Sequence, residues 1–109
     1  MSRGVYARRV DDNQKELTNL WRKMEVSVLL LHVVGNGCPD MLLGFTDYQG
    51  KPVNILVEVK DGKKPLSAQK LTMGEVEFFN KWQGQVCIIR SKTEAKELIN
   101  KYRLPPDDS

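Results

Sequence analysis

The chain has 109 residues, of which 40% are hydrophobic and 28% charged, a balance typical of a globular domain and not of a disordered or fibrous chain. Its 17 basic and 14 acidic residues leave a net charge of +3, too small an excess to identify a partner by itself. Two cysteines and one histidine argue against a disulfide scaffold and a zinc cluster. We expect one domain over residues 1–109, ordered from about residue 8 to 102, with a flexible tail over 103–109.

The compartment is indicated by the apolar segments and the cysteines. The longest apolar run, residues 26–34, is too short to span a bilayer, and the N-terminal residues lack the apolar stretch of a signal peptide. Cys87 lies in an apolar run, where a buried free thiol is the usual state. We therefore expect a cytoplasmic protein that does not associate with a membrane.

The first half of the chain predicts one helix and three strands. Leucine, tryptophan and methionine recur at helical spacing in the helix, and branched residues fill the first strand up to Gly35-Asn36-Gly37. A turn at residues 47–52 separates the second strand from the third. The expected ranges are 12–24 for the helix and 26–34, 41–46 and 53–60 for the strands.

The second half predicts a helix, a strand and a helix. The first of these helices should direct Val76 and Phe79 inward and end at Gly84. Ser91 and Glu94 have the spacing of a capping box at the start of the last helix. The expected ranges are 73–82 and 92–102 for the helices and 85–90 for the strand.

The order of these elements predicts an α/β fold with a mixed four-stranded sheet flanked by helices. Short loops join the first three strands, which should form an antiparallel meander. A helix lies between the third and fourth strands, so these two should be parallel with a right-handed crossover.

Three charged residues lie at strand ends that this topology brings together. Asp40 precedes the second strand, and Glu58 and Lys60 close the third on one face. Two neighbouring carboxylates repel each other unless a cation lies between them, and carboxylate oxygens suit Mg²⁺ or Mn²⁺. With the lysine, such a site could activate water and stabilise a developing charge in phosphodiester hydrolysis. The alternative is an ordinary salt bridge at a strand end, since the pattern is short and frequent.

Two segments, GCPDML at residues 37–42 and ILVEVKDG at 55–62, resemble the motif of the PD-(D/E)XK nuclease superfamily. More narrowly, the chain resembles the short stand-alone VRR-Nuc domains of phages and bacteria, whose eukaryotic relatives end the Fanconi-associated nuclease. The similarity covers about residues 8–99. It implies a restriction-endonuclease-like αβββαβ core, a Mg²⁺- or Mn²⁺-dependent DNA endonuclease, and a homodimer acting on branched DNA such as Holliday junctions, in a bacterium or a phage-infected host cell.

The resemblance also implies roles for individual residues. Asp40 and Glu58 become metal ligands, with the main-chain carbonyl of Val59 between them, and Lys60 orients water or stabilises charge. The first helix of such nucleases often adds a polar residue, for which Gln14 and then Asn13 best continue the apolar stripe. An exposed first turn is the alternative.

One position departs from the family pattern. The family usually has a glutamine at the start of the helix after the lysine-rich loop, where this chain has Glu75. Glu75 would be a third carboxylate, either a metal ligand or a weaker DNA contact. Gln69 lies in the loop and could be mistaken for the expected glutamine.

Basic residues gather near the motif and at the N-terminus. These residues could bind the phosphate groups of DNA, or they could be ordinary exposed charges that only contact water. The expected DNA-binding residues are Lys63, Lys64, Lys70, Arg8 and Arg9.

The remaining polar and aromatic residues fit structural roles better. His32 falls in the predicted first strand and reads as a core or edge histidine. Trp21, Trp82 and the Phe78-Phe79 pair recur at helical spacing, which favours core packing over base stacking.

We therefore expect a metal-dependent endodeoxyribonuclease that uses no small-molecule cofactor. The alternative is a non-cleaving module that holds DNA or a protein partner on a nuclease fold. A restriction-type nuclease is less well supported, because 109 residues leave no visible recognition insert.

Overall fold

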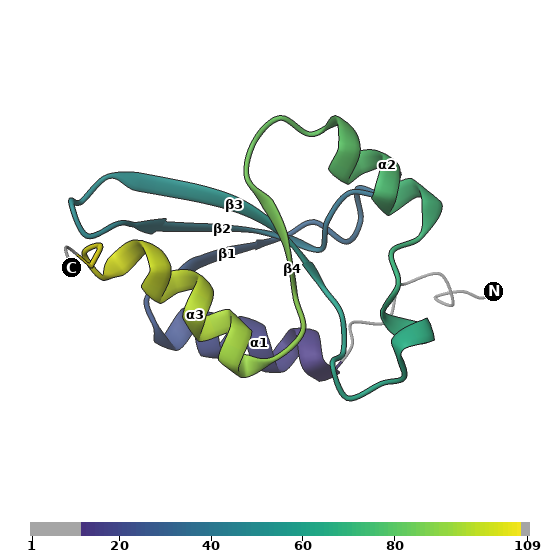
Figure 1. The fold of residues 1–109 in the computed structure, drawn as a ribbon, viewed down its shortest axis with the longest axis horizontal. Coiled ribbons are helices and arrows are strands. Elements are labelled where there is room, and N and C mark those ends of the chain that lie inside the picture. The colour runs from purple at the N-terminus through teal and green to yellow at the C-terminus, as the bar shows by residue number, and fades with distance from the viewer. Residues whose placement is uncertain (1–11, 108–109) are drawn as a thin grey trace.

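The computed structural model describes residues 12–107 and shows an α/β fold of three helices and a four-stranded mixed sheet (Figure 1). The predicted order of elements is confirmed, with a 3₁₀ turn at Leu66–Gln69 in addition. Arg8 and Arg9 lie outside the described residues. The helices are α1 (Asp12–Lys23), α2 (Met73–Lys81) and α3 (Lys92–Arg103), and the strands are β1 (Ser27–Leu30), β2 (Met41–Thr46), β3 (Pro52–Val59) and β4 (Val86–Ile89).

The strands lie in the order β1-β2-β3-β4, as the loop lengths predict. β1, β2 and β3 form an antiparallel meander, and β3 pairs with β4 in parallel. Met41 lies opposite Val57, so the start of β2 is beside the end of β3. The turn between them is held by Asp47, whose Oδ1 accepts from the backbone N–H groups of Gln49 and Lys51 at 2.8 and 2.9 Å.

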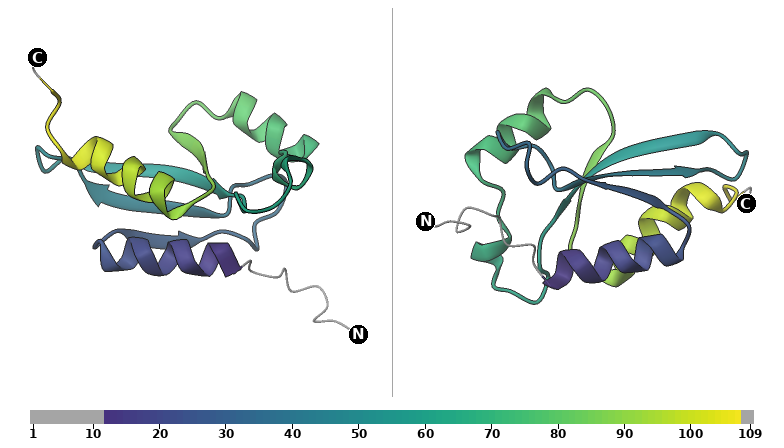
Figure 2. Two further views of the ribbon diagram at one scale, coloured as in Figure 1. Left: turned by 60° about the horizontal axis from the view of Figure 1, so that its bottom comes forward. Right: turned by 180° about the vertical axis from the view of Figure 1, so that it is seen from behind.

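The core lies between one face of the sheet and the pair α1 and α3, which are side by side (Figure 2). Alternate residues of β2 and β3 point into it, and Leu17 and Trp21 of α1 are fully buried. Trp21 Nε1 donates to the carbonyl of Ala95 in α3 at 3.1 Å, which satisfies the buried indole N–H. α3 also buries Ala95 and Ile99, the apolar face that its sequence predicts.

β1 is shorter than the sequence predicts. Residues 32–34 form a turn, closed by the Val34 N–H donating to the Leu31 carbonyl at 2.9 Å, so the placement of His32 within a strand is wrong. The last bond along this pair runs from the Leu31 N–H to the Asp40 carbonyl at 2.8 Å. The chain then turns through Gly35, Asn36 and Gly37 at φ angles of 75°, 56° and 76°.

α2 differs from its prediction because it buries no residue. Val76, expected to point inward, is 43% exposed, whereas Phe78 and Phe79 are half-buried. The helix ends at Lys81 with Trp82 as its C-cap, not at Gly84. The capping box is here, between Thr72 and Glu75. At α3 the Ser91 hydroxyl accepts from the Glu94 N–H as expected, but the Glu94 carboxylate accepts from the Arg90 N–H.

Among residues 12–107, no helix is long and apolar enough to cross a membrane.

Candidate metal centre

A polar pocket of about 220 Å³ opens at the end of the sheet where β2 starts and β3 ends. α1, the loop after β1, the segment after β3 and the start of α2 also contribute to its wall. All three residues of the predicted catalytic motif line it. The full lining is Gln14, His32, Asp40, Glu58, Val59, Lys60, Asp61, Lys64, Ala68 and Glu75.

The backbone of β3 fixes the first carboxylate. The Val59 N–H donates to Oδ2 of Asp40 at 2.7 Å, so the Asp40 side chain is tied to the strand that carries Glu58. The Asp40 main chain is tied on its other side to Leu31. Asp40 is therefore held by β3 through its side chain and by the end of β1 through its main chain.

Lys60 lies between two carboxylates. Its Nζ is 3.3 Å from Oε2 of Glu58 and 2.9 Å from Oε1 of Glu75, and its side chain is only 13% exposed. Its N–H donates to the Ile89 carbonyl at 3.0 Å, and its own carbonyl accepts from Nδ2 of Asn13 at 2.9 Å. These contacts hold the ammonium group in one place at the pocket wall.

Glu58 is the most perturbed carboxylate of the pocket. Its side chain is 5% exposed, and its Oε1 atom is buried without a hydrogen-bond partner. Burial away from water, and then the negative charges of Asp40 and Glu75, raise the pKa of Glu58 to about 8. An ionised Glu58 would leave this buried oxygen without a donor, which is unfavourable, so without metal the carboxyl keeps its proton, and a bound cation could take the place of that proton.

The other charged groups respond to the same cluster. Burial also raises the pKa of Asp40 above its ordinary value, against the opposing effect of the Val59 N–H. Burial would lower the pKa of Lys60, but its contacts with Glu75 and Glu58 outweigh this and raise it. Burial would raise the pKa of Glu75, but the Thr72 N–H and Lys60 outweigh this and lower it. Lys60 and Glu75 thus remain charged as an ion pair. The raised pKa values of Asp40 and Glu58 mean that these two carboxylates do not readily carry negative charge together.

The raised pKa of Glu58 predicts that the metal-free protein loses stability as the pH rises. An unfolded Glu58 titrates near 4.5 and the folded one near 8, so between these values the folded state keeps a proton that the unfolded state releases. The stabilisation from the proton on Glu58 is complete below pH 4.5 and is lost by about pH 8. The pKa of Glu75 is lowered, so its effect on stability falls at lower pH, outside this range. Thermal melts in chelator should show the Tm falling by on the order of 10 °C from pH 5 to 8.

Glu58→Gln is the matched control for this experiment, because it removes the titrating group and keeps the side-chain shape. Its Tm should change much less over the same pH range. Mg²⁺ at pH 8 should raise the Tm of the wild-type protein more than that of the variant. If the Tm of the two proteins changed in the same way with pH, Glu58 would have an ordinary pKa and the prediction would be wrong.

The residues of this pocket fit a hard divalent cation. Asp40 and Glu58 present carboxylate oxygens, and the partnerless Oε1 of Glu58 is the specific atom that a cation would satisfy. Val59 lines the pocket as well, and its main-chain carbonyl is the candidate for a further oxygen ligand. Within residues 12–107, no group of three or more His, Cys, Asp or Glu side chains is placed to hold a metal ion. Two carboxylates with water and substrate oxygens are the usual ligand set for Mg²⁺.

The predicted auxiliary residues all reach this region. Gln14 is 6% exposed, lines the pocket and has a buried Nε2 without a partner, so it can donate to a bound anion or water. Asn13 acts through the main chain of Lys60. Glu75 contacts Lys60 and caps α2 with the same Oε1 atom, since the Thr72 N–H also donates to it at 2.9 Å. Glu75 therefore positions Lys60.

The predicted DNA-binding lysines are exposed but do not form one cluster. Lys64 lines the pocket, and Lys63 is beside it. Lys70 lies in a separate groove with Arg90 and Leu66. Gln69 holds the loop by donating to the Lys64 carbonyl at 2.7 Å, a structural role.

Sequence reasoning missed His32, which lines the pocket although it reads as a core or edge histidine. The pairing of Leu30 with Met41 could have indicated this position, because it brings the residues after β1 beside those before β2. Comparisons of the chain with protein-family models, with curated proteins and with solved structures found no match.

Proposed function

We propose that this protein is a divalent-metal-dependent endodeoxyribonuclease with a restriction-endonuclease-like arrangement of its site. The single observation that supports this most strongly is the pocket in which Asp40, Glu58 and Lys60 converge, with an oxygen of Glu58 buried and unpartnered. Mg²⁺ or Mn²⁺ bound there would supply an activated water and polarise a phosphoryl oxygen.

The chain's own residues then perform distinct tasks. Asp40 and Glu58 would ligate the cation, with the Val59 carbonyl as a third oxygen. Lys60, held by Glu75 at 2.9 Å, orients the attacking water or stabilises the charge that develops on the phosphate. Gln14 lines the same pocket, and its buried Nε2, which has no partner, could bind a phosphate oxygen or water.

The exposed lysines of the loop after β3 are proposed to bind the DNA backbone. Lys63→Ala with Lys64→Ala should weaken DNA binding and reduce the slope of log K against log salt concentration by roughly 1.5, because two phosphate contacts are lost. Filter binding or fluorescence anisotropy over a salt series measures both quantities. Lys96→Ala with Lys101→Ala in α3 is the charge-matched control. Normal binding by the loop variant at every salt concentration would show that the loop does not touch phosphate.

Branched DNA such as a Holliday junction is the proposed substrate, and a homodimer the proposed assembly. Resolving a four-way junction needs two matched cuts, and one chain of this size offers one such pocket among its described residues. A twofold dimer places two sites in a fixed relation.

Purified protein incubated with labelled junction, flap and linear duplex tests the proposal. Cleavage should appear with Mg²⁺ or Mn²⁺ and disappear with chelator, fastest on the junction. Metal-independent cleavage would contradict the mechanism. Tight binding without cleavage in either metal would favour the alternative of a non-cleaving DNA-binding or protein-interaction module.

A further inference from the structure

Two aromatic side chains of the α2 region are not part of the core. Trp82 is 47% exposed, in contrast to the fully buried Trp21, and Phe78 is half-buried. The rings of Phe78 and Trp82 stack with their centroids 5.3 Å apart and their planes at 15°. The prediction from helical spacing that both tryptophans pack in the core is therefore wrong for Trp82. A large stacked aromatic surface left open to solvent needs a ligand or a partner to explain it.

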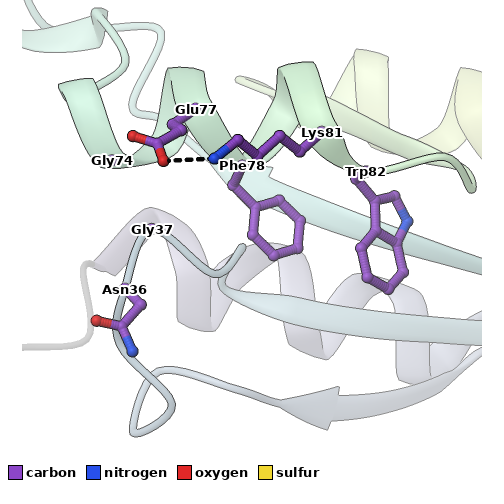
Figure 3. A pocket seen from close by; sticks show the side chains of 7 residues that line it. All are labelled: Asn36, Gly37, Gly74, Glu77, Phe78, Lys81 and Trp82. Atoms are coloured by element: carbon purple, nitrogen blue, oxygen red, sulfur yellow. Dashed lines mark hydrogen bonds and ion pairs between the residues drawn. The ribbon is translucent and has the colours of Figure 1, made fainter.

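These rings form one side of a pocket of about 500 Å³, a size typical of small-ligand sites. Figure 3 shows both rings on the same side of α2, and Asn36 on the neighbouring loop also lines the pocket. Glu77 and Lys81 pair at 2.8 Å on the helix, so the pocket has no net charge of its own from these residues. It therefore combines a flat aromatic surface with one amide that can both donate and accept hydrogen bonds.

The aromatic pocket and the metal pocket share the same two supporting segments. A Cβ added to Gly37 would lie 2.2 Å from the carbonyl oxygen of Gly74, so the two backbones touch where the loop meets α2. Gly37 and Gly74 line the aromatic pocket, while Asp40 and Glu75, a few residues further along each segment, line the metal pocket. The two pockets are therefore neighbours on either side of this contact.

We propose that the aromatic pocket binds an unpaired nucleobase of the DNA strand whose phosphate lies in the metal pocket. This inference rests on the proposed function. A nucleobase fits the pocket because its flat face can stack on an outer face of the Phe78–Trp82 pair and its edge groups can pair with the Asn36 amide. The absence of a net charge among the lining side chains suits a neutral base better than a phosphate. Unpaired bases occur at junctions and flaps, which gives the protein a means of preferring branched DNA.

The test compares two single strands of equal length that carry the same phosphates. One is a labelled thymidine oligonucleotide and the other its abasic counterpart. Anisotropy in chelator measures binding without cleavage. The wild-type protein should bind the thymidine strand roughly 5- to 100-fold more tightly than the abasic strand, the range expected for stacking of one base.

Trp82→Ala should remove this difference by weakening the thymidine strand to the abasic level, with the abasic affinity unchanged. Trp82→Phe keeps a ring and should retain most of the difference. The tryptophan fluorescence of the wild-type protein, which comes from Trp82 and the fully buried Trp21, should also be partly quenched by the thymidine strand and not by the abasic strand. That measurement needs no variant, so it remains decisive if Trp82→Ala fails to fold.

Equal affinity of the wild-type protein for the two strands would overturn the proposal, as would equal weakening of both by Trp82→Ala. A change from dimer to monomer in light scattering, with the preference for bases unchanged, would assign the pocket to a second copy of the chain and also overturn it. Failure of the proposed function is distinguishable. If the proposed function fails, no metal supports cleavage but the preference for the thymidine strand persists. If the protein cleaves DNA without that preference, only the proposed role of the aromatic pocket is overturned.

Discussion

Asp40→Ala and Glu58→Ala are each expected to lower the rate of DNA cleavage by about 1,000-fold or more. Each substitution removes one of the two carboxylates that line the metal pocket, and neither side chain belongs to the apolar core. With one carboxylate missing, the site can neither hold the cation in place nor activate a water at neutral pH. Single-turnover cleavage of a labelled junction in saturating Mg²⁺ measures the loss.

The folded state must be checked differently for the two variants. Asp40→Ala leaves the Val59 N–H without its acceptor, which costs about 1–3 kcal/mol if water cannot replace it, so Asp40→Asn is the better-matched variant. Glu58→Ala removes a carboxylate that is unfavourable without metal, and its Tm in chelator at pH 8 should not fall. Glu97→Ala, an exposed carboxylate of α3, controls for charge. Full-rate cleavage by either site variant would rule out the mechanism.

Lys60→Met should lower the cleavage rate by about 100-fold or more while changing DNA affinity by less than about threefold. The substitution keeps the aliphatic stem but removes the ammonium group that lies between Glu58 and Glu75. A buried charge that acts on the transition state affects kcat, whereas exposed loop lysines act on binding. Comparing single-turnover rates and equilibrium binding separates the two effects. Lys60 would be a simple phosphate contact if affinity fell as much as in the Lys63 and Lys64 double variant.

The meeting of Asp40 with Glu58 could be predicted because it depends on one local rule. Two antiparallel strands joined by a tight turn place the start of one beside the end of the other, and the turn at Asp47 is encoded by its own side chain. The predicted bounds of β2, residues 41–46, are confirmed. Its residues alternate between buried and half-buried, and the turn at Asp47 ends it where the sequence predicts. The sequence pattern alone was enough to bring the three motif residues to one pocket.

The errors arose where structure depends on a distant partner. Branched residues favour a long first strand, but the chain turns at residues 32–34 and then passes through three residues with positive φ. Helical spacing shows that Phe78 and Trp82 share a face, yet it cannot show that no element covers this face. The role of Glu75 depends on Lys60, 15 residues away in the sequence, so the capping contact with Thr72 is only part of what Glu75 does.

Because α2 buries no residue, it should detach from the domain more often than α1 or α3. α1 and α3 can open only by exposing the core, whereas α2 is held to the rest of the domain by the Gly37 contact, the Lys60–Glu75 pair and the half-buried Phe78 and Phe79. Segments with so little buried apolar surface open locally, far more often than the whole domain unfolds. In such an opened state Asp40 and Glu58 would keep their places on the sheet while Lys60 lost its anchor. If the proposed function holds, such opening of α2 would let a bulky branched strand reach the metal pocket, and closing would return Lys60 to its position.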